Sequence, residues 1–185
     1  ATNASIGVHA AMQDSTPMIL FIGDVSRDDR DREGFQEVDF NAMFTPLAKW
    51  AARIDNAARI PEYIARAFDT ASSGRPGPVV LALPEDMLRD EVEALDRPKV
   101  IAPAQPLCPD AMTTLTDMLR DATDPIAIIG GAGWSDKAKQ YFAQYAERIG
   151  LPVAVAFRRQ DNFPNESPVY AGNLGYGPNP KLTQR

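Results

Sequence analysis

The fold class of this chain is decided by Gly74-Arg75-Pro76-Gly77-Pro78-Val79-Val80-Leu81-Ala82-Leu83-Pro84. The apolar run over residues 79–83 has the length of a strand, and Pro84 ends it because proline cannot donate a hydrogen bond to a sheet. A continuous apolar run is typical of a strand that is buried on both faces, as in a parallel sheet. Residues 18–22, Met-Ile-Leu-Phe-Ile, form a second run of this kind.

Helical patterns lie between these runs. Pro61 suits the first turn of a helix, and Gly74 suits its end. We also predict a short helix over residues 5–13, a helix over 41–49 that breaks near Pro46, and a short strand over 51–54. The alternation of strand and helix indicates an α/β fold with a parallel sheet. The apolar face of the helix that begins at Pro61 is formed by Ile64, Ala67, Phe68 and Ala71.

The α/β rhythm stops after Pro84 and restarts near residue 109. The interval contains Pro98, Pro103, Pro106 and Pro109. Because proline favours an extended, semi-rigid chain, we predict a linker over residues 91–108. It would join a unit of residues 1–90 to a second unit of residues 109–185. A long surface loop within one domain is the alternative.

The second unit repeats the pattern, with strands predicted over residues 126–129 and 153–157 and a helix over 135–149. An earlier helix is predicted around residues 112–119. Residues 158–185 show no strand or helix pattern strong enough to close a domain. We therefore expect two parallel sheets flanked by helices, with both units incomplete. The apolar face of the first helix is formed by Met112, Leu115 and Leu119, and that of the second by Ala138, Phe142, Tyr145 and Ile149.

The composition excludes several classes of function. A net charge of −6 argues against nucleic acid or an anionic membrane as a partner, since both attract positively charged proteins. No apolar run approaches the roughly 20 residues that span a bilayer, and no signal peptide is visible. The single cysteine, Cys108, favours a cytoplasmic location. With one cysteine, Cys108, and one histidine, His9, the chain lacks an internal disulfide and the residues for most zinc sites. We assign no metal ligand.

Two segments of the first unit are candidates for chemistry. In Gly34-Phe35-Gln36-Glu37, the amide of Gln36 can bind a substrate carboxylate or carbonyl, and Phe35 can wall an apolar pocket. A surface turn anchored by Phe35 is the alternative. Lys49 stands beside Trp50 in an apolar stretch. A buried lysine must pair or shift its pKa, whereas one near the surface extends its ammonium into water.

The second unit offers the glycine-rich turn Gly130-Gly131-Ala132-Gly133 between a predicted strand and a predicted helix. Such a turn lets a phosphate approach the backbone at a helix N-terminus. However, the third glycine of a dinucleotide fingerprint is replaced by Asp136, so tight turn geometry alone is the alternative. Arg158-Arg159 follows the next predicted strand and suits either an anion clamp or a solvated loop.

The order of several motifs resembles the thiamine-diphosphate enzymes of the acetolactate synthase type over nearly the whole chain. The first unit resembles the later half of their pyrimidine-binding domain, and the second unit much of their central domain. The motifs of the first unit are Ala1-Thr2-Asn3, residues 10–17, Gln36-Glu37, Thr45-Pro46 with Lys49, and residues 74–84 with Asp86. Those of the second are residues 125–133, 150–153 and 170–175.

The resemblance implies an enzyme that decarboxylates a 2-oxo acid such as pyruvate and transfers the resulting acyl carbanion to an acceptor. It implies thiamine diphosphate and Mg²⁺ as cofactors, and a homodimer or homotetramer whose active site lies between subunits. The family's activating glutamate lies upstream of the matched segment and its metal-binding motif downstream. We therefore expect the chain alone to be inactive.

The resemblance also implies roles for individual residues. Gln36 and Lys49 match catalytic positions, whereas Asn3 and Phe35 match positions near the cofactor. Residues 157–161, Phe-Arg-Arg-Gln-Asp, depart from the synthase pattern, which weakens the expectation of FAD and of acetolactate chemistry. A nucleotide-binding or structural α/β module without catalysis is the alternative function. The positions that touch flavin, where a relative has one, are Gly130, Gly131 and Gly133.

Overall fold

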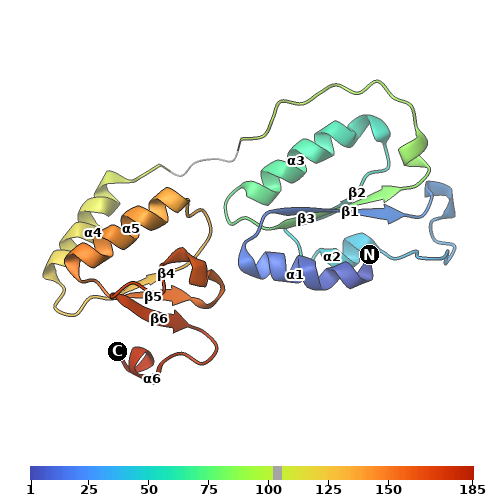
Figure 1. Cartoon of the computed structure of the whole chain (residues 1–185). Coiled ribbons are helices and arrows are strands. Elements are labelled where there is room, and N and C mark those ends of the chain that lie inside the picture. The colour runs from blue at the N-terminus through green and yellow to red at the C-terminus, as the bar shows by residue number, and fades with distance from the viewer. Residues whose placement is uncertain (102–105) are drawn as a thin grey trace. The chain divides into compact units, whose positions relative to one another are not determined.

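The computed structural model describes residues 1–101 and 106–185. The chain forms two compact units, Ala1–Ala104 and Gln105–Arg185 (Figure 1). The part of the predicted linker that contains Pro103 lies outside the described residues. The boundaries that we predicted from composition, 1–90 and 109–185, stay predictions.

The first unit is built on a sheet of three parallel strands in the order β1-β3-β2. Helix α3 covers one face of this sheet, while α1 and α2 lie on the other (Figure 1). This arrangement confirms the predicted parallel α/β class. The strands are β1 (Met18–Asp24), β2 (Trp50–Arg53) and β3 (Pro78–Pro84), and the helices are α1 (Ser5–Asp14), α2 (Phe40–Phe44) and α3 (Ile60–Ser72).

Strand β3 is buried on both faces, as its apolar run predicts. Val79 and Leu81 pack toward α3, where they meet Ala67. Val80 points to the opposite face and packs in the cluster that contains Phe44 of α2. Side chains alternate between the two faces of a strand, so one apolar run supplies two separate cores.

Helix α3 confirms most of its predicted apolar face but not Phe68. Ala67 and Ala71 are fully buried, whereas 54% of the Phe68 side chain is exposed. Successive residues of an α-helix differ by about 100° around its axis, so Phe68 points away from the sheet once Ala67 faces it. Ser73 caps this helix with extended backbone, and Gly74 follows in the left-handed region at φ 56°.

The second unit has three parallel strands in the order β4-β5-β6. Helices α4 and α5 lie on one side of this sheet and the short α6 on the other (Figure 1). The elements are α4 (Pro109–Asp121), β4 (Ala127–Ile129), α5 (Asp136–Ile149), β5 (Val153–Ala156), β6 (Tyr170–Leu174) and α6 (Pro180–Gln184). Short 3-10 turns are formed by Thr2–Ala4, Arg27–Asp29, Ala57–Arg59, Met87–Arg89 and Phe157–Asn162.

Residues 158–185, whose sequence shows no strong strand or helix pattern, contain strand β6 and the short helix α6. Strand β6 contains Gly172 and Asn173, two residue types that are rare in strands. Its pairing with β5 overrides this weak propensity. Leu182 of α6 lies over Gly172, where an added Cβ would be 3.6 Å from Leu182 Cδ2.

Helix α5 begins and ends as predicted, but its inner face differs. Ser135 Oγ accepts a hydrogen bond from the Ala138 amide at 3.1 Å, and Gly150 ends the helix at φ 66°. The predicted inward residues Tyr145 and Ile149 are 36% and 47% exposed. Small side chains, Ala143 and Ala146, face the core instead and bring the helix close to the sheet.

Helix α4 packs less than its pattern predicts. None of its residues is buried. Leu119 contacts the core, while Met112 and Leu115 are 45% and 48% exposed. The spacing of these apolar residues therefore predicts the helix correctly but does not predict that two of them stay about half exposed.

The central position of β3 leads to a stability prediction. Substitution Leu81→Ala in the full-length protein should lower the free energy of unfolding of the first unit by about 2–5 kcal/mol, because it opens a cavity in the core. Phe68→Ala removes a larger but half-exposed side chain from the same unit and serves as the control. Urea denaturation measures both. Equal losses for the two variants would contradict the assigned packing.

Candidate functional site

The candidate site lies at the carboxyl ends of the three parallel strands of the first unit, where ligands usually bind in α/β sheets. Two hollows meet there and share Asp24. We call the first hollow, with a volume of about 360 Å³, the acidic pocket. We call the second, with a volume of about 480 Å³, the Gln36 pocket. The acidic pocket is lined by Asp24, Arg30, Asp31, residues 37–41, Arg53, Asp55 and Ala82. The Gln36 pocket is lined by residues 23–26, Asp29, Arg32, residues 34–36 and Glu85.

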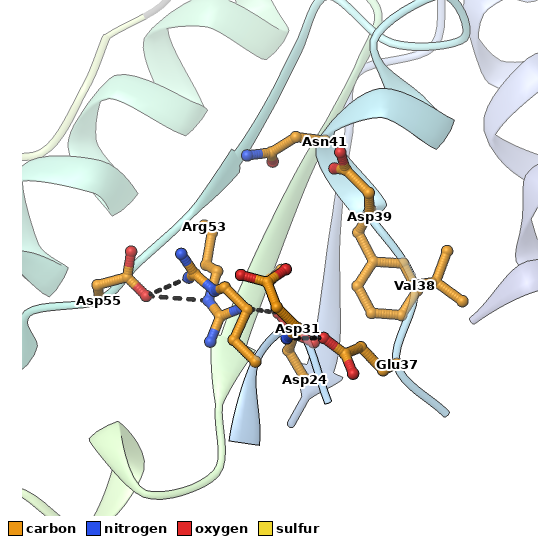
Figure 2. A pocket seen from close by; sticks show the side chains of 11 residues that line it. Asp24, Asp31, Glu37, Val38, Asp39, Asn41, Arg53 and Asp55 are labelled. Atoms are coloured by element: carbon orange, nitrogen blue, oxygen red, sulfur yellow. Dashed lines mark hydrogen bonds and ion pairs between the residues drawn. The ribbon is translucent and has the colours of Figure 1, made fainter. Parts of the chain in front are cut away.

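A buried ion pair forms the floor of the acidic pocket (Figure 2). Arg53 Nη1 lies 3.0 Å from Asp24 Oδ2, and the two side chains are only 12% and 4% exposed. Arg53 Nε also lies 2.9 Å from Asp55 Oδ1, in an orientation that makes no hydrogen bond. Asp24 Oδ1 accepts a further bond from the Val25 amide at 2.9 Å. Each buried charge therefore has a partner, as burial requires.

The same ion pair crosses the central strand. Asp24 ends β1 and Arg53 ends β2, while β3 lies between these strands, with Ala82 opposite Arg53. Strands are about 4.8 Å apart, so the pair spans roughly twice that distance. The small side chain of Ala82, which is 2% exposed, leaves the room for it.

A second set of contacts ties the loop after β1 to the turn after β3. Arg27 donates to Asp86 from its backbone amide at 2.8 Å and from Nε at 2.6 Å, and its Nη2 lies 3.0 Å from Asp90. Ser26 Oγ donates to Glu85 at 3.0 Å. The hydrogen bond from the Arg27 guanidinium lowers the pKa of the Asp86 carboxyl below its usual value. We call the contacts between Arg27 and Asp86 the Arg27–Asp86 clasp.

The predicted turn Gly34–Glu37 is present and presents two side chains to solvent. The Glu37 amide donates to Gly34 O at 3.0 Å and closes a β-turn. Gln36, the third residue of this turn, has φ 67°, at a position where glycine or asparagine is usual. Phe35 is 91% exposed, so it does not anchor the turn as the alternative interpretation supposed.

Left-handed backbone is concentrated in this loop. Asp31, Glu33 and Gln36 have φ of 66°, 56° and 67°. A residue other than glycine lowers the free energy of unfolding by roughly 1–2 kcal/mol when its backbone is left-handed. The Glu37 carboxylate accepts hydrogen bonds from the amides of Asp31 at 2.5 Å and Gly34 at 2.9 Å. These backbone hydrogen bonds, from Asp31 first, lower the pKa of Glu37 below its usual value.

Lys49 lies at the other end of the sheet. Its amide donates to Pro78 O at 2.8 Å, and Pro78 is the first residue of β3. Its ammonium donates to Thr70 O and, at 2.7 Å, to Ser73 O, which are carbonyls at the C-terminus of α3. A cation suits that end of a helix. The structure therefore does not bring Lys49 together with Gln36, and the ammonium caps a helix.

Asn3 lies in the exposed turn Thr2–Ala4 that precedes α1. Helix α1 runs antiparallel to β1, so its N-terminus lies toward the carboxyl edge of the sheet (Figure 1). Asn3 thus lies at the same edge as Gln36 and Phe35. Its predicted contact with a cofactor stays a prediction.

The three glycines predicted in the second unit are explained by backbone geometry. A Cβ on Gly130 would lie 2.9 Å from the Ala156 Cβ, so no larger residue fits. Gly131 and Gly133 have φ of 76° and 90°. The Trp134 indole donates to Gly130 O at 2.9 Å and fixes the turn. These glycines lie at the carboxyl edge of the sheet of the second unit, whereas Gln36 belongs to the first unit.

Sequence reasoning missed Asp24, Arg53 and the Arg27–Asp86 clasp. A usable signal exists for the first two residues. Asp24 follows the apolar run over residues 18–22 after one glycine, and Arg53 is the last residue but one of the strand predicted over 51–54. Charged residues at those positions lie at the edge where parallel strands place ligands.

Comparison with known proteins finds one family along most of the chain. Residues 112–185 match the model "Thiamine pyrophosphate enzyme, central domain". A probable acetolactate synthase large subunit of Methanocaldococcus jannaschii is 30% identical over 182 residues, which are 95% of this chain and 31% of that protein. A glyoxylate carboligase of Escherichia coli O157:H7 is 30% identical over 178 residues, 94% of this chain and 30% of that protein. The family model and these relatives, which match 94–95% of the chain, support a thiamine-diphosphate enzyme of the acetolactate synthase type.

A solved structure agrees with this assignment to the thiamine-diphosphate enzymes. Benzoylformate decarboxylase from Polynucleobacter necessarius has a TM-score of 0.78 and 26% identity, covering 94% of this chain and 33% of that one. The chain spans about a third of the length of the relatives that it matches. In the part of the chain that the structure describes, no helix is long and apolar enough to cross a bilayer.

The carboxyl edge suits the rings of thiamine diphosphate better than its diphosphate. The Phe35 ring and the Gln36 amide offer apolar and neutral polar contacts to an aromatic ring. Asp24, Asp29 and Glu85 line the same pocket and would repel a diphosphate. Within residues 1–101 and 106–185, no group of three or more histidine, cysteine or acidic side chains is placed to hold a metal ion.

The buried ion pair should dominate the stability of the carboxyl edge. Asp24→Asn leaves the Arg53 charge buried without its main partner and should cost about 3 kcal/mol in the free energy of unfolding. Asp55→Asn alters a half-exposed partner of the same guanidinium and should cost less than about 1 kcal/mol. Urea denaturation of the full-length protein compares the two. A larger loss for Asp55→Asn would overturn the assignment.

The Arg27–Asp86 clasp predicts a pH dependence. Because the folded state lowers the pKa of Asp86, the clasp stabilises the protein above the ordinary aspartate pKa of 3.8 and is lost as the pH falls through the lowered value. Between pH 7 and pH 3, the melting temperature of the Asp86→Asn variant should therefore fall less than that of the unaltered protein. Thermal unfolding at the two pH values tests this, and identical losses would contradict it.

Proposed function

We propose that the full-length protein decarboxylates a 2-oxo acid, such as pyruvate, and transfers the acyl unit to an acceptor. One observation supports this most directly. Two relatives that match 94% of the chain are named for glyoxylate and benzoylformate, and both compounds are 2-oxo acids. The relatives carry out different overall reactions by name, so the acceptor is not specified.

Gln36 and Phe35 are the residues of this chain that we propose for the reacting end of the site. The Gln36 amide donates to a substrate carboxylate or carbonyl and carries no charge that changes with pH. The exposed Phe35 ring shields the reacting carbon from water. Thiamine diphosphate, when bound, supplies the electron sink for decarboxylation. The acidic side chains of the neighbouring pocket favour a cationic ring at this edge.

The remaining cofactor and assembly proposals follow from the family. We propose that Mg²⁺ and the diphosphate bind outside this chain and that the enzyme is a homodimer or homotetramer. FAD, if present, would bind at the Gly130–Gly133 turn, and the visible absorption spectrum of the purified enzyme tests for it. Light scattering gives the oligomeric state.

The experiment uses the full-length protein with thiamine diphosphate and MgCl₂. Calorimetry should show binding of the cofactor, and CO₂ should be released from at least one of pyruvate, glyoxylate and benzoylformate. Absence of both binding and CO₂ release would overturn the proposal. Binding of an adenine nucleotide without thiamine diphosphate would favour the nucleotide-binding module instead.

The Gln36 side chain should be needed for turnover, although its left-handed backbone lowers the stability of the protein. Gln36→Gly removes the side chain but relieves the left-handed backbone, so turnover should fall at least tenfold while stability rises by up to about 1 kcal/mol. Glu33→Gly relieves strain in the same loop without touching Gln36 and should keep turnover. Steady-state CO₂ release and urea denaturation measure both effects. Unchanged turnover in Gln36→Gly would show that the Gln36 side chain has no role in the reaction.

A further inference from the structure

The loop that carries Gln36 cannot hold its conformation by residue type alone. Asp31, Glu33 and Gln36 all adopt left-handed backbone, with φ between 56° and 67°, and none of them is glycine. Strained backbone of this kind persists only where the surrounding structure holds it, and it often lies at functional sites. A specific contact must therefore hold residues 31–37.

The Glu37 carboxylate makes that contact. Its Oε1 accepts from the Asp31 amide at 2.5 Å, and its Oε2 accepts from the Gly34 amide at 2.9 Å. The Glu37 amide donates to Gly34 O at 3.0 Å and closes the same loop a third time. Hydrogen bonds to a charged carboxylate are about twice as strong as neutral ones.

The other attachment of this loop is weaker. Arg30 pairs with Asp55 at 2.9 Å, but these side chains are 42% and 51% exposed. Exposed ion pairs contribute little to stability because water and salt screen them. Among the described contacts of residues 30–37, the Glu37 carboxylate therefore provides the main restraint.

We propose that Glu37 is a positioning residue for Gln36. Its carboxylate fixes the left-handed turn, and the turn directs the adjacent Gln36 side chain to the pocket. Both carboxylate oxygens are occupied by backbone amides, so Glu37 acts through the loop and not on the substrate. The inference rests on the proposed function for its effect on turnover, but its effect on the loop is independent of any reaction.

The first test compares Glu37→Gln with Glu33→Gln in the full-length protein. Glutamine keeps the shape of Glu37 but loses its charge and one of the two accepted hydrogen bonds. Exchange of the Asp31 and Gly34 amides with deuterium should accelerate roughly tenfold or more, the change expected when a hydrogen bond to a charged group is lost. Decarboxylation should slow by a similar factor, with thiamine diphosphate binding unchanged. Glu33→Gln makes the same chemical change in the same loop and should alter neither measurement.

The second test is rescue. Adding Glu33→Gly to Glu37→Gln removes one strained residue, so the double variant should recover part of the amide protection and part of the turnover. A carboxylate that acted directly on the substrate would gain nothing from Glu33→Gly. Unchanged amide exchange in Glu37→Gln, or a double variant that recovers neither property, would overturn the inference. If the full-length protein decarboxylates no 2-oxo acid, the proposed function fails, while amide exchange still decides the role of Glu37 in the loop.

Discussion

The carboxyl edge of the first unit depends on one ion pair that crosses the central strand. Asp24 and Arg53 come from the two outer strands and meet over Ala82 of β3. The pair fixes the ends of both strands, and the loop with Gln36 begins just beyond Asp24. A larger side chain at position 82 would separate the two charges and loosen every element that follows them.

Next to the Asp24–Arg53 ion pair, the carboxyl edge has a rigid part and a part with strained backbone. The Arg27–Asp86 clasp extends the pairing of β1 and β3 past the ends of these strands. Residues 31–37 then depart from ordinary backbone and present Phe35 and Gln36 outward. A rigid base with a strained, exposed tip is a common arrangement for binding loops, since the base carries the stability that the tip gives up.

The sequence predicted the strands with long apolar runs because burial on two faces leaves a direct pattern. It did not predict β6, where Gly172 and Asn173 join a sheet through pairing with β5 and not through propensity. The side-chain contacts of the carboxyl edge were harder to predict, since the Asp24–Arg53 pair joins residues 29 positions apart. Such a contact follows from strand order, which no local pattern encodes.

Individual side chains show the same limit. Lys49 was expected to pair if buried, and it does, but its partners are carbonyls at the end of α3. Gln36 was identified by resemblance, whereas its left-handed backbone had no signal because glycine is absent there. Residue types predict what a position can do, and the tertiary contacts select which of those roles it takes.

The loop over residues 31–37 contains within itself most of what determines its conformation. The strained residues, the carboxylate that restrains them and the side chain that they present all lie within a single short segment. Such a segment carries its own geometry and needs only two anchored ends. It could therefore be inherited, exchanged or grafted as a unit between scaffolds, whereas the ion pair beneath it must evolve together with three separate strands.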